Sequence, residues 1–201
     1  GVCRNSAAAQ LTGRCDENPE LRSTDNTMSK QVYSFAEGDG KNKKLLGGKG
    51  ANLCEMTQMG INVPPGFVIT TEACLEFLSG NELPDSLLAE IADQVAMLEK
   101  ATGKSFGKGA NPLLVSVRSG SALSMPGMMD TILNLGLNED TLQSLIQQTS
   151  DERFAYDAYR RFIQLFGKVA LGIADEPFDE IFDEVKERVG VTADVALEAP
   201  H

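Results

Sequence analysis

Residues 113–136 read LLVSVRSGSALSMPGMMDTILNLG, and this stretch decides the fold predicted for the chain. The apolar run at residues 113–117 contains β-branched side chains, which favours a buried strand ending at Arg118. Pro126-Gly127 is a turn signal, and a second apolar segment, Thr131–Leu135, follows it. The pattern predicts two strands joined by a loop within an α/β unit.

The end of the first predicted strand carries a candidate anion site. Arg118 is followed by Ser119 and Gly120, so a fixed cation stands beside small residues whose backbone N–H groups can face an anion. An arginine that is salt-bridged at a strand end is the alternative interpretation.

A glycine-rich loop upstream carries a single lysine. The segment LLGGKGANL places Gly47, Gly48, Lys49 and Gly50 at the start of a helical pattern. There the unpaired N–H groups and the helix dipole favour an anion, and glycine lets the backbone approach a phosphate closely. The spacing differs from a Walker A loop, because no Ser or Thr follows the lysine. A plain turn with a solvated lysine is the alternative.

Four segments carry a family resemblance: LLGGKGANL, VPPGFVITTEAC, SVRSGSALSMPGMMDTILNLGLN and RFAYDAYRRFIQLFG. Together they resemble the amino-terminal nucleotide-binding region of pyruvate phosphate dikinase, from about residue 30 to about residue 187. The resemblance implies an ATP-grasp-like lobe followed by a small helical subdomain. It also implies the family's reaction, in which ATP, phosphate and pyruvate give AMP, pyrophosphate and phosphoenolpyruvate with Mg²⁺.

The resemblance also implies roles for individual residues. Lys49 matches the lysine that contacts the ATP phosphates, and Arg118 matches the arginine that clamps the transferring phosphates. The cradle around them would be shaped by small residues, namely Gly47, Gly48, Gly50, Ser119 and Gly120. Some family members have a second arginine where this chain has Ala122. No metal ligand is predicted in this chain.

Composition excludes several other classes of protein. With 18 Lys and Arg against 29 Asp and Glu, the 201 residues carry a net charge of −11, which disfavours nucleic acid or an anionic membrane as the main partner. No apolar run is long enough to span a membrane. Cys54 and Cys74 are predicted as buried apolar residues of helices. The only histidine is His201, which disfavours a structural zinc site.

The chain divides into four predicted parts. Residues 1–27 form an extended or disordered arm, which has Arg4 and Arg14 but no acid before Asp16. The arm is either a transit-segment remnant, which would indicate a plastid, or a plain flexible tail, which leaves a cytoplasmic location open. An α/β lobe spans residues 28–136, a helical subdomain residues 137–190, and a tail residues 191–201.

Helices are predicted from apolar periodicity and capping residues. Thr70 or Thr71 caps a short helix, and Asp85 caps a helix whose apolar stripe, including Leu88, forms core. Further helices begin at Asn138, at Asp151 and at Pro177. Arg160 and Arg161 are expected to be salt-bridged, and residues 102–112 are expected to form a polar loop.

The sequence is compatible with two functions. An ATP-grasp site needs a second lobe with Mg²⁺ ligands and adenine contacts, and the resemblance ends before that lobe. We therefore expect weak or no ATP binding by this chain alone, and catalysis only together with the remaining parts of a dikinase. The alternative is a non-catalytic remnant that serves as a binding or scaffold subunit, with the N-terminal arm and the surface left by the missing lobe as protein contacts.

Overall fold

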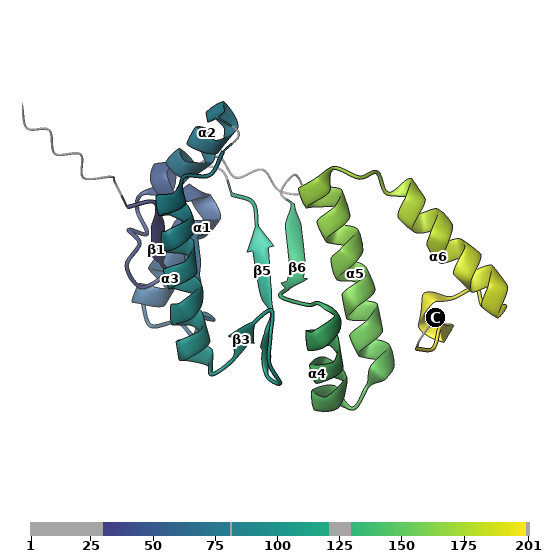
Figure 1. The fold of residues 1–201 in the computed structure, drawn as a ribbon. Helices are drawn as coiled ribbons and strands as arrows, with labels where there is room; N and C mark the ends of the chain where they lie inside the picture. The colour runs from purple at the N-terminus through teal and green to yellow at the C-terminus, as the bar shows by residue number, and fades with distance from the viewer. Residues whose placement is uncertain (1–29, 81, 121–129, 200–201) are drawn as a thin grey trace, which may run out of the picture.

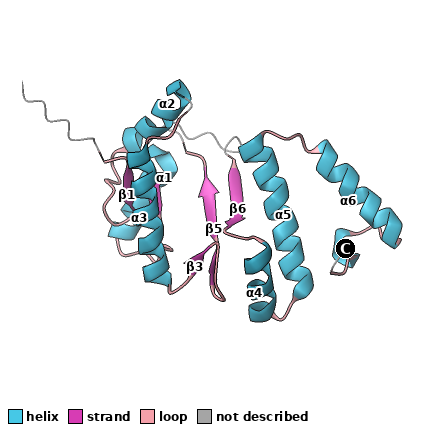
Figure 2. Cartoon of the chain, in the orientation of Figure 1, coloured by secondary structure: helices cyan, strands magenta, loops and turns pink. Residues whose placement is uncertain are grey.

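A computed structural model describes residues 30–80, 82–120 and 130–199 (Figure 1). The described chain is a mixed α/β structure in which helices predominate and short strand pairs lie between them (Figure 2). The elements, in order, are β1 (Val32–Ser34), α1 (Lys43–Gln58), β2 (Phe67–Ile69), α2 (Thr71–Gly80), α3 (Asp85–Thr102), β3 (Ser105–Phe106), β4 (Pro112–Leu113), β5 (Val115–Arg118), β6 (Thr131–Leu135), α4 (Glu139–Thr149), α5 (Glu152–Leu171), α6 (Glu176–Val189) and a 3₁₀ turn (Asp194–Ala196).

The described strands form three separate pairs. β1 and β2 are antiparallel, β3 and β4 are parallel, and β5 and β6 are antiparallel. In the last pair the partners of Val115 and Val117 are Leu135 and Ile132, so β6 holds one extra residue. This β-bulge contains Asn134, which has a left-handed φ of 58° that asparagine tolerates better than most residues.

The prediction of one buried strand over residues 113–117 is wrong. Leu113 belongs to β4 and is buried, whereas β5 starts only at Val115 and becomes exposed along its length. Val117 is 46% exposed. The reason is that β5 has a single described strand neighbour, and α5 packs against β6 rather than against β5. Residues 102–112 also differ from the expected loop, because β3 and β4 lie within them.

The N-terminal half is held by two small clusters of buried side chains. Val32, Ala73 and Leu87 form one, where β1, α2 and α3 meet. Leu46, Ala51 and Cys54 of α1 form the other. Cys54 is therefore buried, as predicted, and burial raises the pKa of its thiol.

Three predictions in this half are wrong in detail. Cys74 is exposed, because α2 buries only Ala73. Leu88 is 47% exposed, since the buried stripe of α3 runs through Leu87. Asp85 is the first helical residue and Pro84 occupies the cap position without a side-chain hydrogen bond. Thr70 does cap α2, since its hydroxyl accepts a hydrogen bond from the Ala73 amide at 3.2 Å.

The C-terminal half follows its local sequence signals. Asn138 and Thr141 form a reciprocal capping box at the start of α4, and Asp151 caps α5. Pro177 lies in the first turn of α6, as predicted. The core here is a cluster under α4 and α5, and α5 packs against β6 (Figure 1). Its buried members are Leu137, Leu142, Leu145, Ala155 and Ala158.

The division at residues 27, 136 and 190 stays a prediction. The arm at residues 1–27, the turn at Pro126-Gly127 and Ala122 lie outside the described residues. None of the helices that the structure describes is both long enough and apolar enough to cross a membrane.

Candidate functional site

The glycine loop is built around a break within α1. Gly47 has φ 67° and ψ 165°, which lies outside helical geometry and divides α1 into one turn and a longer helix. Glycine adopts a positive φ without a Cβ penalty. Asn42 caps the first turn, because its side chain accepts a hydrogen bond from the Leu45 amide at 3.1 Å. The sequence predicted a loop here, and the structure instead has this helical turn before the break.

The break gives residues 48–50 the position of a helix N-terminus. A helix that starts after Gly47 places the backbone N–H groups of Gly48, Lys49 and Gly50 in its first turn, at the positive end of the helix dipole. Lys49 is exposed, and it forms no ion pair with any described residue. A first helical turn of this kind can bind a phosphate group.

Core packing holds the glycine loop in position. Leu46 is 3% exposed and Ala51 is fully buried, so the residues that flank the loop are anchored in the core. Gly50 lies directly against β2, where an added Cβ would stand 2.8 Å from Cγ1 of Val68. The loop backbone can lie this close to the strand only because Gly50 has no side chain.

Arg118, Ser119 and Gly120 lie at the exposed end of β5. Arg118 pairs with Thr131, which continues the ladder to the last residue of the strand. The Ser119 amide and hydroxyl both donate to the carbonyl of Asp130, at 3.0 and 3.2 Å. In this structure Ser119 thus shapes the strand end, and its two donors are directed to Asp130 rather than to a ligand. Arg118 makes no ion pair with a described residue.

The two halves of the candidate site belong to different packing units. Lys49 lies on α1, which contacts α2 and β2, whereas Arg118 lies on β5, which contacts β6. No hydrogen bond among the described residues links residues 47–50 to residues 118–120. Their convergence on one phosphate chain therefore stays a prediction.

The described ranges do not provide a metal site. They contain no group of three or more His, Cys, Asp or Glu residues that could hold a metal ion. Mg²⁺ in nucleotide sites is usually held by one or two carboxylates together with the phosphates of the substrate, so no residue of this chain is assigned to the ion.

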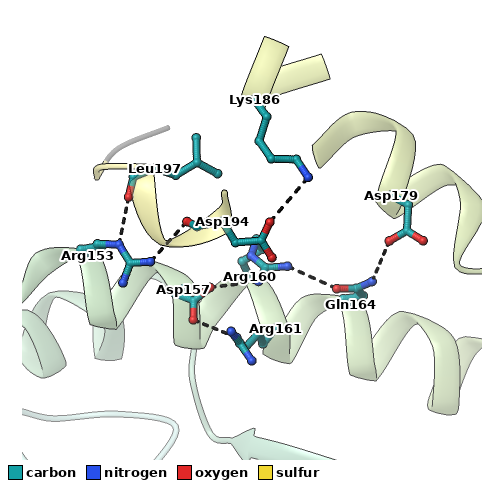
Figure 3. Close-up of polar contacts among 9 residues, drawn as sticks. All are labelled: Arg153, Asp157, Arg160, Arg161, Gln164, Asp179, Lys186, Asp194 and Leu197. Atoms are coloured by element: carbon teal, nitrogen blue, oxygen red, sulfur yellow. Dashed lines mark hydrogen bonds and ion pairs between the residues drawn. The ribbon is translucent and has the colours of Figure 1, made fainter. Parts of the chain in front are cut away.

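Sequence reasoning missed a second feature, a cavity of about 340 Å³ between α5, α6 and residues 194–199. Its walls are mainly apolar and include Tyr159, Ile163 and Phe182. The C-terminal segment closes one side, because Arg153 donates to the Leu197 carbonyl at 3.0 Å (Figure 3). The amphipathic patterns of α5 and α6 indicated two apolar faces, but nothing in the pattern indicated that the tail folds back onto them.

Near this cavity, polar side chains form salt bridges within α5 and contacts between α5 and α6 (Figure 3). Asp157 accepts from Arg160 at 2.9 Å and from Arg161 at 2.8 Å, so both arginines are salt-bridged, as predicted. The guanidinium of Arg160 also lies 4.3 Å from the ring centroid of Phe182 on α6. Burial raises the pKa of Asp157, but the hydrogen bonds and charges of the two arginines outweigh it and hold that pKa below its ordinary value.

The Asp157 network predicts an acid-dependent loss of stability. We expect Asp157→Asn to lower the free energy of unfolding by about 0.5–1 kcal/mol at neutral pH, since the pair is partly exposed. A lowered folded pKa stabilises the protein above the unfolded value of about 3.9, and this stabilisation is lost as the pH falls through the lower folded value. The difference in the free energy of unfolding between wild type and Asp157→Asn should therefore become smaller in acid. Urea unfolding across a pH series measures it.

Glu180→Gln is the control, because Glu180 is exposed and makes no ion pair with a described residue. It should match wild type at each pH. A gap for Asp157→Asn that stays constant down to the acid limit would contradict the assignment.

Comparison with known proteins first gives the class. Residues 43–102 match the family model described as "Pyruvate phosphate dikinase, AMP/ATP-binding domain". The match contains the glycine loop and Lys49 and ends before Arg118. Residues 43–102 are thus similar to part of a nucleotide-binding domain.

The relatives then give the particular family. A pyruvate, phosphate dikinase of Entamoeba histolytica is 57% identical over 170 residues, which covers 84% of this chain and 19% of the relative. The Clostridium symbiosum enzyme is 49% identical, over 86% of this chain and 20% of the relative. Pyruvate, phosphate dikinase 1, chloroplastic, of Arabidopsis thaliana is 49% identical, over 85% of this chain and 18% of the relative.

The chain is similar to the pyruvate, phosphate dikinases over most of its own length, so the resemblance found in the sequence is confirmed. It spans about a fifth of the length of the curated relatives that it matches. It therefore corresponds to a portion of the nucleotide-binding region of a pyruvate, phosphate dikinase-like protein.

Proposed function

We propose that this chain contributes the phosphate-binding part of the ATP site in a pyruvate, phosphate dikinase-like phosphotransferase. The reaction would be that of the relatives as their family resemblance implies, from ATP, phosphate and pyruvate to AMP, pyrophosphate and phosphoenolpyruvate. The observation that carries the proposal is the break at Gly47, which starts a helix whose first turn holds an exposed lysine. The fold proposed for residues 28–136 is an ATP-grasp-like lobe.

The residues divide into cations and cradle. Lys49 would place a point charge against the phosphates, and Arg118 would offer a planar fork that binds two phosphate oxygens at once. Such cations stabilise charge as it moves between oxygens during phosphoryl transfer. Five small residues would form the cradle: Gly47, Gly48, Gly50, Ser119 and Gly120.

ATP titration of the isotope-labelled chain tests the proposal through amide chemical shifts. We expect a dissociation constant of about 1 mM or weaker, because the described residues provide cations and N–H groups but no metal site. The shifts should concentrate on residues 47–50 and extend to residues 118–120. Lys49→Ala should remove the response at residues 47–50, and Arg118→Ala should weaken it only where the two cations share one ligand.

Lys100→Ala is the matched control, because Lys100 is an exposed lysine in the last turn of α3. It should leave the titration unchanged. ATP-dependent shifts that avoid residues 47–50, or a Lys49→Ala variant that titrates like wild type, would overturn the proposal. Isothermal titration with Mg·ATP is expected to give no micromolar affinity.

A second function, as a binding subunit of a larger assembly, is favoured by one surface. The α2 helix exposes Leu75 by 65% and Leu78 by 67%, and exposed apolar residues that gather on one helix are typical of protein contacts. The native mass distinguishes the two, because a species well above 21.6 kDa that Leu78→Asp returns to the monomer supports the subunit.

The compartment belongs with the proposal as well. Several relatives are named as chloroplastic, whereas the amoebal and bacterial relatives carry no such word. We propose a plastid, with the cytoplasm as the alternative. Imaging of a C-terminally tagged chain in its native cells separates them.

A further inference from the structure

The break at Gly47 affects backbone hydrogen bonding in the turn before the glycine loop as well as in the helix after it. A helix that stops after one turn leaves its carbonyl groups without regular helical partners. In the turn at residues 43–46, Leu46 is buried, whereas Lys43 and Lys44 are exposed.

One of these carbonyls receives a side-chain donor from a distant element. The hydroxyl of Thr71 donates to the carbonyl of Lys44 at 2.6 Å. This distance is at the short end for an O–H···O hydrogen bond, and the bond connects residues 27 positions apart. It is a tertiary contact between α2 and the turn that precedes Gly47.

The backbone next to the Thr71 hydroxyl is fixed by hydrogen bonds. Thr70, its neighbour, is 1% exposed and caps α2, and the Thr70 amide donates to the Gln31 carbonyl at 2.9 Å. The backbone at Thr71 is thus tied both to its own helix and to the strand layer of β1. A hydrogen bond from a fixed point restrains the group that accepts it.

We propose that Thr71 is a positioning residue for the glycine loop. Its hydroxyl fixes the Lys44 carbonyl, while Val68 of β2 contacts Gly50 on the other side of the break. The two contacts hold the chain on both sides of Gly47 and so set the direction in which the N–H groups of residues 48–50 point. The benefit for phosphate binding rests on the proposed function, whereas the effect on loop geometry does not.

Thr71→Val is the direct test, because valine keeps the shape and removes only the donor. In the absence of ligand, the amide chemical shifts should change at residues 47–50 as well as next to the altered groups at residues 44 and 71, while α4, α5 and α6 keep their wild-type shifts. In the ATP titration, the dissociation constant should rise by about threefold to tenfold, as expected for one net hydrogen bond. Thr71→Ser, which keeps the hydroxyl, should restore both readouts, and Thr71→Ala replaces the valine variant if that variant does not fold.

Thr149→Val is the control, since its hydroxyl donates to the Leu145 carbonyl at 2.8 Å on α4. Thr149→Val should lose this hydrogen bond, and the one that the hydroxyl accepts from the Asp151 amide at 3.3 Å, without moving the shifts of residues 47–50. If wild type shows no response to ATP, the proposed function fails, yet moved loop shifts in Thr71→Val still support positioning. Unchanged loop shifts in Thr71→Val, or equal changes in Thr149→Val, overturn the inference.

Discussion

Gly136→Ala is expected to lower the free energy of unfolding by about 2–5 kcal/mol, among the largest single effects in the chain. Gly136 follows β6 with φ +112°, a conformation that L side chains rarely adopt, which costs about 1–2 kcal/mol. An added Cβ would also stand 2.6 Å from the backbone oxygen of Leu113. A backbone oxygen in β4 cannot change rotamer as a side chain can. The end of β6 must therefore move away from β4 to accept the new Cβ.

Two other glycines separate the causes. Gly103 has φ +67° and open space around it, so Gly103→Ala should show the conformational strain alone. Gly80 has open space and no positive φ, so Gly80→Ala should be as stable as wild type or more stable, since alanine favours a helix. Urea unfolding followed by circular dichroism ranks all three.

The carbonyl of Gly136 makes the effect extend into the helical half. It accepts a hydrogen bond from the hydroxyl of Thr141 at 3.0 Å, and Thr141 belongs to the capping box of α4. Displacement of Gly136 should therefore loosen the start of α4 as well. A Gly136→Ala variant that loses no more stability than Gly103→Ala would contradict the close approach between β6 and β4.

The helices could be predicted because their signals are local. Asn138 and Asp151 lie where a polar cap precedes an apolar period, and the structure begins α4 and α5 directly after them. A cap and its helix lie within four residues of each other. No information from the rest of the fold is needed to recognise them.

Burial on α2 could not be predicted in the same way. Its sequence has apolar residues on most sides, including Ala73, Cys74, Leu75 and Leu78, so the pattern marks no single face. Contacts with β1 and α3 select Ala73 alone. The parallel pair β3 and β4 was missed for a related reason, because strands of two residues are too short to show a period.

The candidate site could likewise be predicted only in part from the sequence. The glycine loop was predicted from its composition, although the division of α1 at Gly47 was not, because a positive φ depends on packing that the sequence does not display. Whether Lys49 and Arg118 meet depends on how two segments almost 70 residues apart are arranged. Spacing along the chain carries no information on that point.

Gly50→Ala is the second variant with a large expected effect, and it acts on the loop directly. The new Cβ would stand 2.8 and 3.0 Å from the two γ-carbons of Val68. Valine is stiff about χ1, and Val68 is held in β2 opposite Tyr33, so neither partner can yield cheaply. Overpacking costs about 1–3 kcal/mol, and the higher helix propensity of alanine offsets at most about 1 kcal/mol of it.

Gly50→Ala is expected to displace the glycine loop while lowering the free energy of unfolding only slightly. The helix after Gly47 would have to shift away from β2, which redirects the N–H groups of residues 48–50. Under the proposed function, the ATP-dependent amide shifts of this segment should disappear, while urea unfolding shows a loss of about 0–2 kcal/mol once the gain in helix propensity is subtracted.

Val68→Ala is the matched partner, because it removes the two carbon atoms that the new Cβ would meet. The double variant Gly50→Ala with Val68→Ala should be more stable than the sum of the two single effects, and the difference is the coupling energy of the pair. The ATP response should return in the double variant at least in part. Strictly additive effects on stability would mean that Gly50 and Val68 do not contact each other, and the packing that orients the phosphate loop would have to be sought elsewhere on α1.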